Sequence, residues 1–70
     1  MKEELGLELK IARIRKGISQ YQLGLVIGEP SYNISRYERG VVIPTPKALS
    51  KINAVLGLTL PTKEASDVRA

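Results

Sequence analysis

Residues 19–40, SQYQLGLVIGEPSYNISRYERG, constrain the fold of this chain more than any other segment. Leu23 and Ile27 are four residues apart, as on one face of a helix, and Gly28 follows where helices commonly end. Pro30 has no amide hydrogen and suits the entrance to a second helix. The segment therefore predicts two short helices joined by a tight turn, an arrangement that can push the second helix outward.

The N-terminal segment predicts a helix with two apolar faces. We expect it to run from about Lys2 to Lys16 and to end at Gly17, a natural C-terminal cap. The face expected in the core holds Leu5, Leu9 and Ala12. The nearly opposite face holds Leu7, Ile11 and Ile14. This second face needs its own cover, which is either Leu58 and Leu60 of the same chain or a partner molecule.

The two short helices on either side of the turn have further signals in the sequence. Ser19 is a good N-cap for a helix of about residues 20–27. Gly24 is a poor helix former, and its place inside this helix suggests that another helix backbone approaches closely there. The next helix spans about residues 31–39 and is closed by Gly40. The expected core residues of this region are Leu23, Ile27, Ile34 and Tyr37.

The rest of the chain predicts a loop, a fourth helix and a tail. Residues 41–43 are β-branched, but two prolines within three residues argue against a paired strand. Thr45 caps a helix that begins at Pro46 and runs to about Leu56. Residues 61–70 are expected to form a short polar, mobile tail. The fourth helix is expected to contribute Leu49, Ile52 and Leu56 to the core.

The composition excludes several classes of function. Seventy residues with 43% hydrophobic side chains form one small domain and leave little room for a deep substrate cleft. The absence of cysteine and histidine excludes thiolate chemistry, disulfides, most zinc sites and imidazole catalysis. No apolar run approaches the roughly 20 residues of a membrane span. We therefore expect a cytoplasmic protein without enzymatic activity, cofactor, metal or membrane attachment.

The net charge of +4 is concentrated in the middle of the chain. Residues 10–51 carry eight Lys and Arg against two Glu, whereas residues 1–9 carry one Lys against three Glu. A basic surface suits a polyanion, because each phosphate neutralised by Lys or Arg releases condensed counterions. The major groove of DNA is also wide enough for an outward-facing helix. Together these features favour DNA binding.

An ordered series of residues resembles the lambdoid phage repressor and Cro class of helix-turn-helix proteins. It covers about residues 5–58 and consists of Leu9-Lys10, Arg13, Gly17-Ile18-Ser19-Gln20, Leu23-Gly24, Ile27-Gly28, residues 34–40, Pro44, Leu49, Ile52 and Leu56-Gly57-Leu58. The resemblance implies an all-α fold, a compact bundle of four to five helices, with the DNA-binding domain at residues 1–60. The chain departs from the class at Glu29-Pro30, where a hydrophobic residue and a Ser or Thr cap are usual, and at Gly24, where alanine is usual.

The resemblance also implies roles for single side chains. It implies contacts to base edges for Ser31, Tyr32 and Arg36. It implies contacts to the DNA backbone for Gln20, Asn33, Ser35, Arg39 and Lys47, and leaves Tyr21 between a phosphate contact and surface packing. It implies a structural, partly buried ion pair between Arg13 and Glu38. The chemistry of Arg36 independently supports its role, because a guanidinium can donate two parallel hydrogen bonds to guanine.

A homodimer is implied by the same class, in which the loop before the fourth helix and the end of that helix form a two-fold contact. The expected dimer or partner surface comprises Val41, Val42, Ile43, Leu58 and Leu60. Such a dimer would place two reading helices about 34 Å apart on one face of a palindromic operator.

Two functions from different classes remain open. The first is a sequence-specific regulator of transcription that binds double-stranded DNA, a repressor or autoregulator of bacterial or phage origin. The second is an antitoxin-like interaction module that holds a partner protein through Leu7, Ile11 and Ile14 or through residues 58–60. Glu29 is assigned no role, because its carboxylate could accept from cytosine but repels phosphates.

Overall fold

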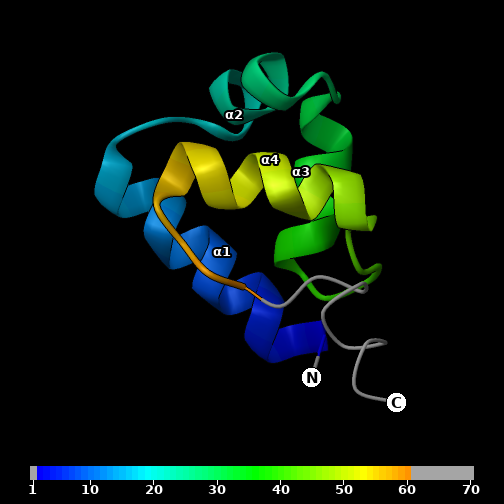
Figure 1. Cartoon of the computed structure of the whole chain (residues 1–70). Coiled ribbons are helices and arrows are strands. Elements are labelled where there is room, and N and C mark those ends of the chain that lie inside the picture. Colours follow the sequence, from blue (N-terminus) through cyan, green and yellow to red (C-terminus); the bar gives the residue numbers. More distant parts are fainter. Residues whose placement is uncertain (1, 61–70) are drawn as a thin grey trace.

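The computed structural model of this chain describes residues 2–60 as four helices (Figure 1). They are α1 (Lys2–Lys16), α2 (Gln20–Ile27), α3 (Ser31–Glu38) and α4 (Pro46–Leu56). No strand is present in the described part of the chain, so the predicted all-α fold is confirmed. Helix α3 ends one residue earlier than expected, because Arg39 is its C-cap. The predicted tail, residues 61–70, lies outside the described residues.

The ends of α2 are fixed by side-chain and backbone caps. The Ser19 hydroxyl accepts from the amide of Gln22 at 3.0 Å, and the Gln22 side chain accepts from the amide of Ser19 at 2.8 Å. At the other end, Gly28 has a φ of 79°, in the left-handed region that favours glycine. Its amide and that of Glu29 both donate to the Gly24 carbonyl at 2.8 Å. This turn sets the direction in which α3 leaves α2.

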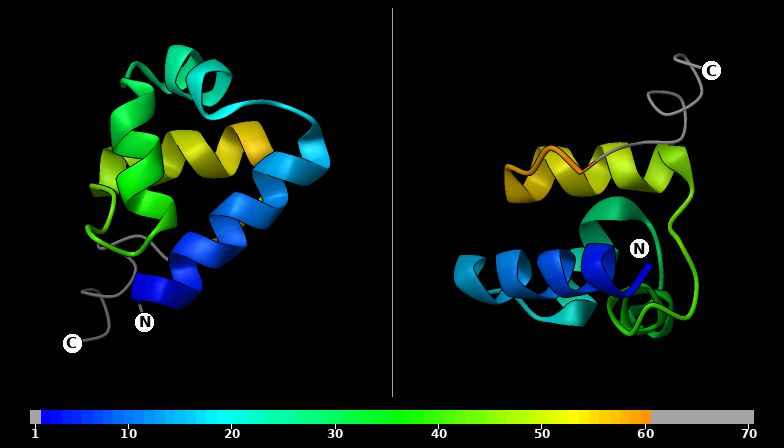
Figure 2. Two further views of the ribbon diagram at one scale, coloured as in Figure 1. Left: turned by 180° about the vertical axis from the view of Figure 1, so that it is seen from behind. Right: turned by 90° about the horizontal axis from the view of Figure 1, so that it is seen from below.

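The helices form two layers. Figure 2 shows α4 running as a separate layer over α1 and the α2–α3 pair. Helix α1 approaches the C-terminal end of α3 so closely that a Cβ at Gly6 would overlap the carbonyl oxygens of Tyr37 and Glu38. Gly6 therefore permits a backbone-to-backbone contact that the sequence pattern did not indicate.

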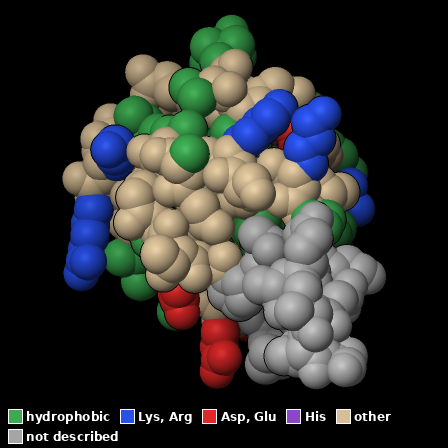
Figure 3. Space-filling model, viewed as in Figure 1, with side chains coloured by type: hydrophobic (Ala, Val, Ile, Leu, Met, Phe, Trp, Pro, Cys, Tyr) green, Lys and Arg blue, Asp and Glu red, His purple; other side chains and the backbone are tan. Residues whose placement is uncertain are grey.

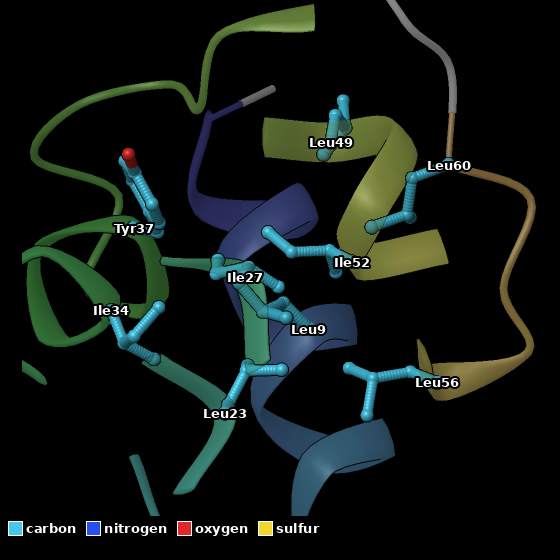
Figure 4. Packing of buried hydrophobic residues seen from close by; sticks show 9 residues of the cluster. All are labelled: Leu9, Leu23, Ile27, Ile34, Tyr37, Leu49, Ile52, Leu56 and Leu60. Carbon is cyan, nitrogen blue, oxygen red and sulfur yellow. The ribbon is translucent and has the colours of Figure 1, made fainter. Parts of the chain in front are cut away.

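One hydrophobic core joins all four helices (Figure 4). Every core residue predicted in α2, α3 and α4 is buried, and so is Leu9 of α1, whereas Leu5 and Ala12 are half-buried against the cluster. Full burial of a leucine or isoleucine side chain stabilises the folded state by about 1.5–3 kcal/mol. The cluster consists of Leu9, Leu23, Ile27, Ile34, Tyr37, Leu49, Ile52, Leu56 and Leu60.

The placement of Leu60 corrects one expectation. Asn53 accepts from the Leu60 amide and donates to the Leu60 carbonyl, both at 3.0 Å, so the chain turns back along α4. Leu60 is therefore 6% exposed and belongs to the core, and its assignment to a dimer surface is wrong. Leu58 is half-buried and packs against the same core.

The structure excludes one of the two covers expected for the second apolar face of α1. Leu7, Ile11 and Ile14 are 55%, 42% and 56% exposed, so Leu58 and Leu60 do not cover them. The intramolecular interpretation of this face is therefore wrong for the described residues.

The expectation at Gly24 needs a smaller correction. A Cβ at this position would overlap the carbonyl oxygen of Glu29, which belongs to the turn and not to another helix. A backbone segment does approach Gly24 closely, but it is the turn that directly follows α2.

Candidate nucleic-acid interface

Helix α3 has one buried face and one open face. Ile34, Tyr37 and Glu38 are buried, which fixes the rotation of the helix about its own axis. Tyr32 is 65% exposed, and Ser31 and Arg36 are half-buried. The three residues predicted to contact bases therefore remain accessible, and the Tyr32 ring is not buried against a neighbouring helix.

Tyr32 and Arg36 form a pair on this open face. They are separated by one helical turn, and the guanidinium carbon of Arg36 lies 5.3 Å from the centroid of the Tyr32 ring. Arg36 forms no hydrogen bond or ion pair with any residue of the described range 2–60, so its donors are available to a ligand. The ring restricts the conformations of a long side chain and so favours a defined position for the guanidinium.

The inner end of α3 is held by a polar cluster of three side chains. Arg13 donates to both oxygens of Glu38, from Nε to Oε2 at 2.5 Å and from Nη2 to Oε1 at 3.1 Å. Gln20 donates to Glu38 Oε1 at 3.1 Å, and Arg13 Nη1 donates to the Ile18 carbonyl at 2.9 Å. The structure thus contains the ion pair expected from the sequence and adds Gln20 as a direct link from α2. The expected phosphate contact of Gln20 stays a prediction.

Besides Gln20, three of the residues expected at the DNA backbone already have partners in the protein. Asn33 Nδ2 donates to Glu29 Oε1 at 3.1 Å, and the Ser35 hydroxyl accepts from Arg39 Nε at 3.2 Å. Asn33 and Ser35 are half-buried. Arg39, Lys47 and Tyr21 are exposed, and their contacts to DNA stay predictions. Figure 3 shows Lys and Arg side chains on the side of the molecule where α3 and α4 lie.

Glu29 has a structural role that the sequence did not reveal. Its Oε1 accepts from the Tyr37 hydroxyl at 2.6 Å as well as from Asn33. Burial, this hydrogen bond and the nearby negative charge together raise the pKa of Tyr37 to about 12. The spacing of residues 29, 33 and 37 at intervals of four was the available signal. Glu29 therefore joins the turn to α3 where the class usually has an apolar residue.

Helix α2 carries an exposed apolar face that sequence reasoning also missed. Tyr21, Leu25 and Val26 are 63%, 65% and 61% exposed, and the eight residues of α2 include no charged side chain. Figure 3 shows hydrophobic side chains at the end of the molecule formed by α2. The signal was present in the periodicity, because Leu25 and Val26 do not share the face of Leu23 and Ile27.

Neither a metal site nor a membrane span is found in residues 2–60. The described chain contains no group of three potential metal-ligating side chains. Within the same range, every helix is too short or too polar to cross a bilayer.

Comparison with known proteins identifies the class of this arrangement. A family model described as Helix-turn-helix, of the Cro/CI type, matches residues 9–62. The chain belongs to this family. It is also 35% identical over 60 residues to multiprotein-bridging factor 1c of Arabidopsis thaliana, a match that covers 86% of this chain and 40% of that protein. No solved structure matches the chain significantly.

Membership in this helix-turn-helix family indicates a DNA-binding regulator of transcription and confirms the resemblance seen in the sequence. The plant protein spans well beyond the matched segment, since the chain corresponds to 40% of its length.

Proposed function

We propose that this helix-turn-helix protein binds double-stranded DNA sequence-specifically by placing α3 in the major groove. The observation that carries this proposal is the Tyr32–Arg36 contact on the open face of α3, because the Arg36 guanidinium there donates no hydrogen bond within the described residues. A guanidinium held in this way can donate two hydrogen bonds to the O6 and N7 of guanine. Ser31 supplies a small donor and acceptor, and the exposed ring of Tyr32 can contact a thymine methyl.

Contacts to phosphates would fix the register of α3 in the groove. Arg39 and Lys47 are exposed cations on either side of the loop after α3, and Tyr21 and Gln20 lie at the start of α2. These four side chains are proposed to contact the DNA backbone, where they contribute affinity without sequence preference. Asn33 and Ser35 are proposed to reach phosphates only through their remaining hydrogen-bonding groups, because each already has a protein partner.

The proposed mode of action is occupancy of an operator by a homodimer. Val41 and Ile43 are 50% and 55% exposed in the loop before α4, whereas Val42 packs against the core. Exposed apolar side chains next to the reading helix suit a two-fold contact between copies on a palindrome. A bound dimer acts as a repressor or autoregulator by excluding other proteins from the site, and a bacterial or phage source stays a prediction.

Selection of bound sequences from a random DNA pool tests this function. We expect a palindromic consensus with guanine at the position read by Arg36, and an affinity that falls steeply with salt. Binding of equal strength to all sequences, or none at low salt, would overturn the proposal. Arg36→Lys serves as a matched variant, because it keeps the charge and removes the bidentate donors.

A second candidate function is the binding of a partner protein, as in an antitoxin-like module. It is favoured by the uncharged, exposed face of α2 and by the name of the plant relative, a multiprotein-bridging factor. Leu25→Gln separates the two functions, because it removes apolar surface without adding charge. A DNA regulator retains its operator affinity in this variant, whereas a bridging module loses recovery of its partner.

A further inference from the structure

The exposed apolar face of α1 is a feature that the proposed DNA binding does not use. Leu7, Ile11 and Ile14 form an apolar ridge, and a groove of about 530 Å³ runs beside it between α1 and the end of α4. Ile11, Ala12, Leu56 and Leu58 supply its apolar lining, with Glu8 and Arg15 at its rim. A ridge beside a groove is a shape that another helix can complement.

The charges around this face are arranged by sign along the helix. The three acidic residues of α1 lie in its first half, and three of its five basic residues, Arg13, Arg15 and Lys16, lie in its last turn. Figure 3 shows acidic side chains at the lower edge, where α1 begins, and Lys and Arg at the left edge, where it ends. Glu8 and Arg15 are seven residues apart, which places them on the same side of the helix about 10 Å apart along its axis. Neither forms an ion pair with any residue between 2 and 60.

We propose that this face binds a second copy of the chain, with the two α1 helices antiparallel. A two-fold axis near Ile11 brings Leu7 close to Ile14 of the second copy. The same axis brings Glu8 to Arg15 of the second copy, and the contact occurs twice. A parallel arrangement would instead place like charges opposite each other, so the charge pattern selects the antiparallel one.

This pairing is independent of the DNA-binding proposal. It uses neither the open face of α3 nor the loop of residues 41–43, and it predicts a dimer of the free protein. Substitutions in α1 therefore test it separately from the loop contact proposed on the operator.

Sedimentation equilibrium of the full chain without DNA provides the first test. We expect a dimer at about 0.1 mM, a concentration suited to a small interface. Ile11→Asp is expected to raise the dissociation constant about a hundredfold, since it places two carboxylates at the apolar centre. Ser50→Asp is the control, because this exposed residue of α4 belongs to neither proposed contact between copies, and it leaves the dimer unchanged. Far-UV circular dichroism verifies that both variants fold.

Charge reversal provides the decisive test, because it leaves the apolar face intact. Glu8→Lys and Arg15→Glu are each expected to weaken the dimer about tenfold. An equimolar mixture of the two variants restores association, since every contact then joins opposite charges, and so does the double variant. A monomeric wild type, or a mixture no tighter than its components, overturns the proposal. Affinity of Ile11→Asp for a single DNA half-site stays at the wild-type value, so a failure of DNA binding is recognised separately.

Discussion

The guanidinium of Arg13 and the carboxylate of Glu38 join α1 to the last turn of α3 through two hydrogen bonds. The two side chains are 11% and 2% exposed, so the pair lies largely out of water. Gln20 adds a third donor to the same carboxylate. The orientation of α3 therefore depends on a polar contact at the end opposite Ser31, where contact with DNA is proposed.

Removal of one partner of this pair is expected to destabilise the domain severely. Arg13→Met keeps much of the side-chain length but leaves the buried charge of Glu38 uncompensated, which costs about 3–5 kcal/mol. The free energy of unfolding in urea, followed by circular dichroism, measures the loss. Lys10→Met is the control, because Lys10 is exposed on the same helix, and it should change the stability by less than about 0.5 kcal/mol. A loss below about 1 kcal/mol in Arg13→Met would show that the pair is not structural.

Gly6→Ala is expected to destabilise the protein although alanine favours helices. Helix propensity alone predicts a gain of about 1 kcal/mol. The added Cβ, however, would overlap the carbonyl oxygens of Tyr37 and Glu38, and backbone atoms cannot rotate away. We expect a net loss of about 1–3 kcal/mol in the free energy of unfolding, as for other overpacked sites. Ser50→Ala, at an exposed position inside α4, is the control and should be close to neutral. A stabilised Gly6→Ala protein would mean that α1 packs less closely on α3.

The bounds of the helices could be predicted because their signals are local. Ser19 and Thr45 are caps with a side-chain oxygen, and Gly17, Gly28 and Gly57 end helices with positive φ angles. Apolar spacing then identified the core, because a side chain on the inner face of a short helix has nowhere else to pack.

The remaining features depend on contacts between segments that are distant in sequence or turned in an unexpected direction. Two hydrogen bonds to Asn53 hold the backbone of Leu60 against α4, where its side chain is buried. Because Leu60 is held there, it does not cover the second apolar face of α1, which stays exposed. Likewise, Glu29 looks like a surface charge in the sequence, and its bonds to Asn33 and Tyr37 appear only when the turn is built. A pattern of residue types does not determine which partner a polar side chain finds.

The stability of the fold should depend on the ionisation of Tyr37 at high pH. Its pKa is raised from 10.0 to about 12 in the folded state, chiefly by burial and then by its hydrogen bond to Glu29. The folded state therefore holds this proton more tightly than the unfolded state does. The associated stabilisation is complete below pH 10 and is lost as the pH rises through 12, by about 2–3 kcal/mol.

The free energy of unfolding of wild type and Tyr37→Phe, measured at about pH 9 and about pH 12, tests this effect. The lower pH lies below the pKa of an unfolded tyrosine, and the upper one lies near the raised pKa of Tyr37. The wild type should lose more stability between the two pH values than the variant. Effects of lysine deprotonation are common to both proteins and cancel in the comparison. Tyr21→Phe, which removes an exposed hydroxyl, should keep the wild-type difference. Equal pH dependence in wild type and Tyr37→Phe would contradict the raised pKa.

Arg36 and Lys47 should affect DNA binding in different ways. Arg36→Ala is expected to cost about 1–3 kcal/mol on the selected operator and much less on unrelated DNA, because it removes hydrogen bonds to a base. Lys47→Ala should weaken binding to both DNAs alike and reduce the slope of log affinity against log salt by about 1, since it removes one phosphate contact. Fluorescence anisotropy at several salt concentrations measures both quantities. Tyr32→Ala should behave like a milder Arg36→Ala, because the guanidinium loses the ring that positions it, whereas Tyr32→Phe keeps that ring and should retain specificity. If Arg36→Ala weakens both DNAs equally, its guanidinium contacts phosphate, and the open face of α3 does not read bases through this residue.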